Sequence, residues 1–152
     1  MRWIVSLAFL IALSGAPVKP NFSGEWLLNL TRSEFGNQTP PKKLTQTVVH
    51  KEPSLELRQS ETSPLDQAVH FECSYTTDGK EVSNLVMGTT VKATARWDGE
   101  ELLIHSWSDF RGLKLEWNDR WRLTENGTTL IVTRQGVSAG GKYEQTLVLD
   151  KQ

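Results

Sequence analysis

The sequence predicts an all-β protein, an antiparallel up-and-down barrel of about ten strands. Stretches of alternating apolar and polar residues recur along the chain, turns with Gly or Pro separate them, and no useful amphipathic helix occurs. Closing the sheet removes its two unpaired edges, and a barrel of this size can hold one small ligand. A two-sheet β-sandwich is the alternative fold, but it usually needs longer crossover connections than this chain offers.

The N-terminus has the features of a signal peptide. Arg2 supplies the positive charge, residues 3–13 are apolar, and Ser14-Gly15-Ala16 offers small residues for cleavage. The apolar stretch is too short to span a bilayer comfortably, although an uncleaved anchor is the alternative. We therefore expect residues 1–16 to be removed. Residues 17–152 should form one domain that is secreted or periplasmic, without stable membrane insertion.

The amino-acid composition argues against some classes of binding partner. Lys and Arg number 17 against 18 Asp and Glu, so no strong field attracts nucleic acid or an anionic membrane. Six Trp in 152 residues is high, and several should line a core or a cavity. The only cysteine, Cys73, cannot form an internal disulfide, and its apolar phase predicts a buried thiol.

The first half of the chain alternates in short segments. The first strand, residues 22–28, carries Gly24 beside Trp26, and a loop at 31–43 follows because Pro cannot continue a ladder. Further strands are expected at residues 44–51, 55–61, 67–75 and 81–86, with turns at Pro53-Ser54, Ser63-Pro64 and Asp78-Gly79.

The strongest hairpin signal is Asn126-Gly127, because both central residues of a type I′ turn need positive φ. If these two residues form the loop, opposed positions follow directly from the pleat. The opposed pairs are then Leu123 with Leu130, Trp121 with Val132, and Asp119 with Arg134. The last pair predicts an ion pair on the inward face.

Other turns extend the same face. A loop at Asp98-Gly99 would place Ala95 opposite Leu102 and Arg96 opposite Glu101. A loop at Arg111-Gly112 would place Leu102 opposite Trp121 and Ser106 opposite Trp117, and a loop at 136–141 would place Tyr143 opposite Arg134. Agreement among independent turns is the consistency expected of a real meander.

Gly24-Glu25-Trp26 on the first strand, followed by this meander, resembles the calycins, which are the lipocalins and fatty-acid-binding proteins. The Gly-x-Trp motif of lipocalins closes the base of the barrel, so the resemblance implies that Trp26 is a plug. Arg96-Trp97-Asp98-Gly99 and Leu149-Asp150-Lys151 are similar to fatty-acid-binding proteins. The fuller opening, from Ser23 to Asn29 and then Ser33-Glu34-Phe35-Gly36, resembles uncharacterised exported bacterial proteins.

Two departures separate the chain from the fatty-acid-binding family. That family carries Arg-x-Tyr on its last strand to hold a carboxylate, and Leu147-Val148-Leu149 stands at the matching place here. The family also inserts two helices after its first strand, where this chain has only a loop broken by Pro. The resemblance thus implies a ligand-binding barrel, but it does not extend to the carboxylate-holding residues.

No catalytic residue, metal site or cofactor is expected. Gly136-Val137-Ser138-Ala139-Gly140 matches the Gly-x-Ser-x-Gly pattern of hydrolases, but that motif needs a helix after the serine and a strand follows here. His50, His70 and His105 lie on separate strands without ligand spacing. A hydrolase using Ser138 is therefore only the third hypothesis for function.

The first hypothesis is a carrier or sensor that holds a small apolar or amphipathic ligand inside the barrel. Apolar wall would come from Trp97, Trp117, Trp121 and Tyr143, and orienting polar groups from Ser106, Asp119 and Arg134. Structural roles fall to Gly24, Trp26, Asn126 and Gly127. The second hypothesis is a filled barrel that acts as a structural or protein-interaction module. It would use an outward apolar patch near Trp107, which the turn register places opposite Thr90.

Overall fold

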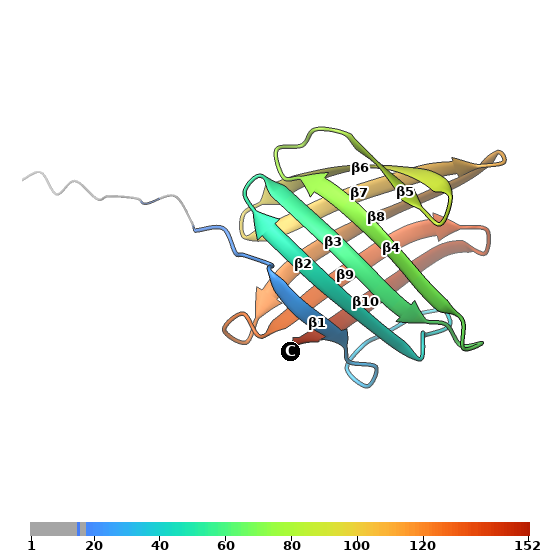
Figure 1. Ribbon diagram of the computed structural model, residues 1–152, viewed down its shortest axis with the longest axis horizontal. Helices are drawn as coiled ribbons and strands as arrows, with labels where there is room; N and C mark the ends of the chain where they lie inside the picture. The colour runs from blue at the N-terminus through green and yellow to red at the C-terminus, as the bar shows by residue number, and fades with distance from the viewer. Residues whose placement is uncertain (1–14, 16–17) are drawn as a thin grey trace, which may run out of the picture.

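The computed structural model describes Gly15 and residues 18–152, and it confirms the predicted fold class. Ten antiparallel strands form one continuous sheet that curls into a nearly closed barrel, which excludes the two-sheet sandwich (Figure 1). The strands are β1 (Gly24–Leu28), β2 (Lys43–Lys51), β3 (Ser54–Thr62), β4 (Ala68–Thr76), β5 (Val82–Val86), β6 (Thr89–Asp98), β7 (Glu101–Phe110), β8 (Leu113–Thr124), β9 (Thr129–Ser138) and β10 (Gly141–Lys151).

The described part of the chain contains no helix, and so none that is long and apolar enough to cross a membrane. The predicted signal peptide, apart from Gly15, lies outside the described residues. The loop predicted at 31–43 joins β1 to β2, and Glu34 in this loop pairs with Thr146 of β10 through two backbone hydrogen bonds of 2.8 Å.

The first and last strands are neighbours within the sheet, because β1 pairs with β10. The two edges of the sheet are β4 and β5, which lie side by side without a backbone ladder. The buried Asn84 of β5 bridges this seam. Its side-chain Oδ1 accepts a hydrogen bond of 2.7 Å from the backbone N–H of Ser74, and its Nδ2 donates one of 3.1 Å to the Ser74 carbonyl.

The tight hairpin expected at Asp78-Gly79 is therefore wrong. Asp78 pairs with Arg96 of β6, and the Gly79 N–H donates to the Ala95 carbonyl at 2.8 Å. These bonds carry the connection onto β6, so β5 pairs with β6 instead of returning along β4. A turn signal identifies a reversal but not the strand that the returning chain will pair with.

The hairpin at Asn126-Gly127 has the predicted register, with Asp119 opposite Arg134 and Trp121 opposite Val132. Glu125, Asn126 and Gly127 have φ of 54°, 58° and 82°, so the loop has three left-handed residues where a type I′ turn has two. The hairpin between β7 and β8 is also as predicted.

Two other hairpins are displaced by two residues from the predictions. The loop between β6 and β7 is Gly99-Glu100, so Ala95 lies opposite Ile104, and Arg96 lies opposite Leu103 instead of Glu101. Asp98 and Glu101 consequently face each other as like charges. Arg120 of β8 compensates, because its Nη1 donates hydrogen bonds to both carboxylates.

The loop between β9 and β10 is Ala139-Gly140, because β9 continues through Gly136 to Ser138. Tyr143 therefore lies opposite Gly136, and Gln145 takes the place opposite Arg134. A displacement of two keeps every side chain on its expected face, since the pleat has a period of two residues.

Aromatic side chains close one end of the barrel. Trp26 is 0% exposed, and its indole N–H donates to the Phe22 carbonyl at 3.0 Å. The Phe22 ring stacks on Trp97 and meets Trp121 edge-on, with centroids 5.9 and 5.6 Å apart. The predicted burial of Trp26 is confirmed, with Phe22 as a second part of the plug.

Glu52 accepts hydrogen bonds from three side chains at this closed end. The Phe22 backbone N–H donates to His50 Nδ1, so the His50 proton is on Nε2, which donates to Glu52 at 2.8 Å. Glu52 also accepts hydrogen bonds from Trp97 Nε1 and Thr77 Oγ1 at 3.0 and 2.7 Å. Burial alone would raise the pKa of Glu52, but these hydrogen bonds lower it below its ordinary value.

Trp26→Ala should lower the free energy of unfolding by about 3–5 kcal/mol, because it removes a fully buried indole from a packed end. Urea unfolding followed by circular dichroism measures this change. Trp107→Ala is the matched control, since Trp107 is only half-buried on the outer face and should cost less. Equal losses for the two variants would show that Trp26 does not plug the barrel.

Gly136→Ala should lower the free energy of unfolding by about 1–3 kcal/mol through overpacking. A Cβ at Gly136 would lie 2.6 Å from the Tyr143 ring. Gly140→Ala on the same hairpin is the control, since its Cβ would meet only Ser138 Oγ at 3.7 Å. Combining Gly136→Ala with Tyr143→Ala should cost less than the sum of the two changes, and additive costs would contradict the proposed clash.

Candidate functional site, a cavity inside the barrel

The barrel interior holds a cavity of about 250 Å³ between the aromatic plug and the loop that follows β1. This is slightly below the roughly 300–1,000 Å³ typical of ligand pockets, so it suits a small molecule. Apolar and aromatic walls come from Leu28, Phe35, Leu44, Leu57, Phe71, Cys73, Val91, Trp117, Trp121, Val132 and Leu147. Polar lining comes from Gln38, Gln46, Gln59, Glu61, Tyr75, Asp119, Arg134 and Gln145.

Asp119 and Arg134 form a bidentate ion pair at this cavity, as predicted. Arg134 Nε and Nη2 donate to the two oxygens of Asp119 at 2.6 and 2.7 Å. The Asp119 side chain is 6% exposed and that of Arg134 is 30% exposed. The pair fits because adjacent strands place the two residues directly opposite each other on the inward face.

The electrostatics keep Arg134 charged and the nearby hydroxyl and thiol neutral. Burial by itself would lower the pKa of the Arg134 guanidinium, but attraction to Asp119 raises that pKa above its ordinary value. Burial raises the pKa of Tyr75 well above its ordinary value, and it also raises the pKa of the Cys73 thiol. Cys73 is buried, as predicted from its alternation with apolar neighbours.

Three polar atoms that belong to residues lining the cavity have no hydrogen-bond partner among residues 18–152. Gln46 Oε1 and Trp121 Nε1 are both buried, in side chains of residues that are 6% and 2% exposed. Arg134 Nη1 is also without a hydrogen bond, because Asp119 engages only Nε and Nη2. Buried polar groups are nearly always satisfied, so Gln46 Oε1 and Trp121 Nε1 are exceptions in the packed wall, whereas the Arg134 side chain is 30% exposed.

The structure gathers four of the seven predicted binding residues at the cavity, namely Asp119, Arg134, Trp117 and Trp121. Trp97, Ser106 and Tyr143 are not among its lining residues. Trp97 belongs to the aromatic plug, and Ser106 is packed in the wall at 1% exposure.

Tyr143 packs across Gly136, and no hydrogen bond joins it to Arg134 within the described ranges. The predicted position of Tyr143 opposite Arg134 is therefore wrong, because β10 is displaced by two residues relative to the prediction. Burial raises the pKa of Tyr143, so its hydroxyl stays neutral at physiological pH.

Sequence reasoning missed the glutamine and glutamate side chains of β2 and β3. Gln46 alternates in phase with Leu44 and Val48, and Gln59 and Glu61 continue the phase of Leu57. A polar residue in the inward phase of a strand was the available signal, since buried polar side chains are uncommon without a specific partner.

The catalytic pattern around Ser138 lacks the setting that it needs. Ser138 lies at the end of β9, and its Oγ accepts a hydrogen bond from the Gly140 N–H at 3.3 Å across a β-hairpin. A serine nucleophile of this type requires a strand that turns into a helix, so the geometry contradicts the hydrolase hypothesis. The described part of the chain also shows no group of three metal-binding side chains.

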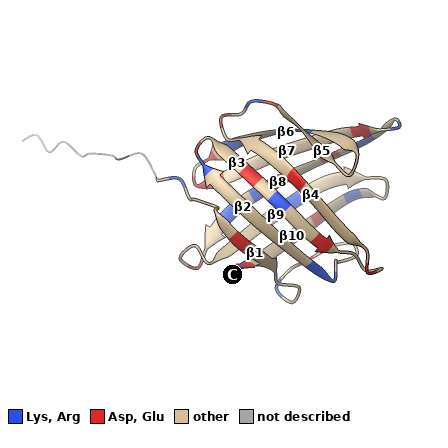
Figure 2. Ribbon diagram, viewed as in Figure 1, with Lys and Arg blue, Asp and Glu red and all other residues tan. Residues whose placement is uncertain are grey.

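The outer face offers less apolar surface near Trp107 than predicted. Trp107 faces outward as expected, but it lies opposite Lys92 instead of Thr90. It is half-buried, because its ring stacks on His105 with centroids 4.9 Å apart. Charged residues of both signs are scattered over the strands and loops in Figure 2, without a face of one sign.

No known protein family matches the sequence, and no curated protein matches it either. Solved structures do share its fold. They include zebrafish ileal bile acid-binding protein complexed with cholic acid, with 17% identity and a TM-score of 0.55 over 86% of this chain and 98% of that one. Secretory abundant heat soluble protein 4 from Ramazzottius varieornatus has 18% identity and a TM-score of 0.61 over 91% and 96%.

Human cRBP IV has 11% identity and a TM-score of 0.57 over 88% of this chain and 99% of its own. At such low identity the likeness concerns the fold. The predicted calycin-like barrel is confirmed at this level.

A double-mutant cycle should detect strong coupling between Asp119 and Arg134. Asp119→Leu and Arg134→Met should each lower the free energy of unfolding by about 3–5 kcal/mol, because each leaves a buried charge unpaired. The double variant should cost much less than the sum, since it leaves no charge to desolvate. Urea unfolding of the four proteins gives the coupling energy.

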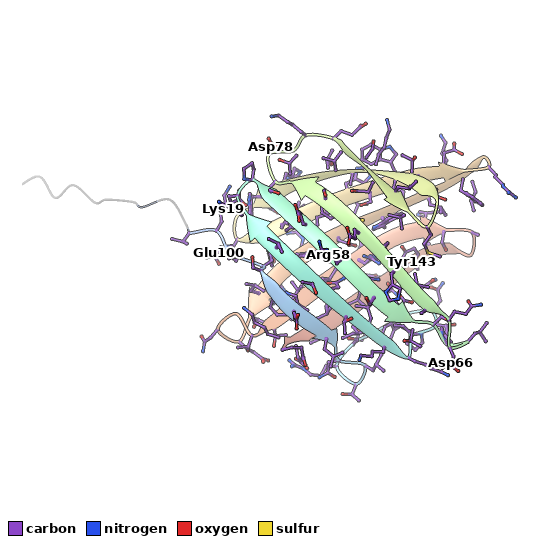
Figure 3. The ribbon with its side chains drawn as sticks, in the orientation of Figure 1. Lys19, Arg58, Asp66, Asp78, Glu100 and Tyr143 are labelled. Atoms are coloured by element: carbon purple, nitrogen blue, oxygen red, sulfur yellow. The ribbon has the colours of Figure 1, made fainter. Side chains whose placement is uncertain are left out.

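The exposed cross-strand pair Arg58 and Glu72 is the control for this cycle. Its side chains are 68% and 72% exposed, with Arg58 on the outer face of β3 (Figure 3). Its coupling energy should be below about 1 kcal/mol. If the two pairs gave the same coupling, the Asp119–Arg134 pair would be as well solvated as a surface pair.

Proposed function

We propose that this protein binds one small, mostly apolar or amphipathic molecule inside the barrel, as a carrier or sensor. The observation that carries the proposal is a cavity of about 250 Å³ in the barrel interior, lined by apolar and aromatic side chains with polar side chains among them. Mostly apolar lining with a few placed polar groups is the usual composition of a ligand site. The likeness in fold to a bile acid-binding protein complexed with cholic acid supports the same function.

The second candidate is a barrel that is filled throughout and acts through its outer face. The aromatic plug favours it at one end, because Phe22 and Trp26 are both 0% exposed. The cavity beside Asp119 and Arg134 favours ligand binding, however, and the stacking of Trp107 on His105 leaves less apolar surface for a partner. Ligand binding is therefore the better supported function.

We also propose that the mature protein works outside the cytoplasm, either secreted or in the periplasm. The support is the order of features at the N-terminus, in which a positive charge at Arg2 precedes an apolar stretch and small residues at 14–16. Expression of the full chain and sequencing of the N-terminus of the exported product would test this part of the proposal.

The binding proposal predicts that the neutral apolar dye phenylnaphthylamine will quench intrinsic Trp fluorescence with one-to-one stoichiometry. Trp117 and Trp121 line the cavity, so a ligand inside it will lie next to both indoles. Titration of the folded protein with the dye measures the quench.

A matched pair of variants locates the dye. Val91 lines the cavity and is buried, whereas Val137 is 42% exposed on the opposite face of the sheet. Val91→Phe should reduce dye affinity by filling the cavity, and Val137→Phe should leave it unchanged. An unchanged affinity in a folded Val91→Phe variant, or no quench at all in the parent protein, would contradict binding inside the barrel.

A further inference from the structure

Exposed apolar side chains gather at one end of the barrel. The aromatic plug lies beside the turns after β2 and β6, and because the strands are antiparallel, the turns after β3, β5, β7 and β9 lie at the opposite end, the open end (Figure 1). Six large hydrophobic side chains lie in these turns or within two residues of them, and they are 39–81% exposed: Leu65, Leu85, Met87, Phe110, Leu113 and Val137. Among the described residues, the exposed large hydrophobics away from these turns are Val18, Leu30 and Val49.

The cavity reaches the same end of the barrel. Leu44, Glu61 and Val86 line it, and each of them lies within two residues of the open end of its strand. Phe35 and Pro41 of the loop between β1 and β2 line it as well. The exposed apolar side chains therefore surround the end of the barrel at which the cavity approaches the surface.

The two ends of the barrel differ in charge. At the open end, three cations within two residues of the turns balance three carboxylates. The turns at the plug end carry seven carboxylates and two lysines on the same count, and Asp98, Glu100 and Glu101 cluster at one of them. Phospholipid headgroups carry phosphate, and anionic lipids give a membrane a negative surface, so an acidic end is disfavoured there.

Cations stand directly beside the apolar side chains of the β7–β8 turn. The Arg111 guanidinium lies over the Phe110 ring, 5.2 Å from its centroid, and Lys114 follows Leu113. Apolar side chains next to Lys or Arg are typical of segments that bind at a membrane surface, because the apolar groups enter the interface while the cations stay at the phosphates. The arrangement at this turn thus matches the chemistry of a lipid surface.

We propose that the open end docks reversibly on the surface of a phospholipid bilayer, with Leu65, Met87 and Phe110 entering the headgroup region. A protein partner would need one contiguous, well-packed patch, whereas these side chains stand on three separate turns, to which a fluid surface can adapt. The inference goes beyond the proposed function, because it concerns an outer surface and a macroscopic partner. Docking in this orientation turns the cavity towards a source of apolar molecules.

The test determines which end of the barrel meets lipid. Met87→Cys, Phe110→Cys and Glu100→Cys are made one at a time in the full-length protein, with Cys73→Ala removing the natural thiol, and each new thiol is labelled with the fluorophore NBD. Vesicles of equal parts phosphatidylcholine and phosphatidylglycerol are added, with or without nitroxide-labelled acyl chains. NBD at positions 87 and 110 should shift to the blue and be quenched by the nitroxide, whereas NBD at position 100 should not respond. Each label reports its own surroundings, so attachment through the apolar stretch at 3–13 would not produce this pattern.

Substitutions in the protein labelled at position 87 separate the apolar and the charged contributions. Phe110→Asp should raise the half-saturating lipid concentration at least about tenfold, and Leu65→Asp does the same test on a separate turn. Val49→Asp is the matched control, because Val49 is 57% exposed on β2 away from the open-end turns, and it should change the value less than about twofold.

The cations are tested on two kinds of vesicle. Arg111→Gln combined with Lys114→Gln should raise the half-saturating concentration about fivefold or more when phosphatidylglycerol is present, and much less on pure phosphatidylcholine. Lys80→Gln is the control, since its side chain is 80% exposed beside a turn at the plug end.

The outcomes also separate this inference from the proposed function. Labels at 87 and 110 that stay unquenched in the folded protein, or equal quenching at position 100, would overturn docking. Self-association without lipid that Phe110→Asp abolishes, measured by sedimentation, would overturn it too, because the surface would then bind a second copy. Phenylnaphthylamine titration without vesicles tests the cavity separately, so either proposal can fail while the other stands.

Discussion

The two-residue period of the strand is the constraint on which the whole molecule depends. One sheet passes through all ten strands, so a residue that faces inward on β1 shares its face with residues on every later strand. Trp26, Leu57, Ala95, Trp121 and Leu147 come from five different strands, and all of them are buried in the same interior. Because this face is continuous, side chains from nearly all the strands line the same interior cavity.

Charge inside such a barrel has to be balanced locally. Asp119 lies between Trp117 and Trp121 along β8 with its side chain 6% exposed, and Arg134 lies opposite it on β9. Their attraction offsets the cost of removing both from water, so the pair adds modest net stability while it excludes other arrangements of the two strands. The Asp119–Arg134 pair therefore brings polar groups to the cavity wall without adding net charge.

Sequence reasoning identified the fold, the inward face and the ion pair. All three depend on the alternation of side chains between the two faces of a strand and on the turn at Asn126-Gly127. It could not fix the hairpins at Gly99 and Gly140. Each glycine can occupy more than one position in a tight turn, and a shift of two residues leaves the apolar pattern unchanged. Tyr143 therefore lies on the predicted inward face, but opposite Gly136 instead of Arg134.

The polar wall was harder still to foresee. The orientation of Gln46 depends on a chain of hydrogen bonds that crosses from β2 to β3. That chain exists only once the register between these strands is known, and the volume of the cavity depends on how all the side chains pack. Alternation alone shows that Gln46 points inward, but it does not show which of its atoms remains free.

The seam between β4 and β5 bears on whether molecules of this protein can associate through their sheet edges. Edge strands are templates on which another chain can add a strand and begin aggregation. Here the two edges lie against each other, and the Asn84 amide occupies the backbone N–H and carbonyl of Ser74 that an incoming strand would use. The residue that bridges the seam therefore also occupies a pair of edge groups on which another chain could start a new strand.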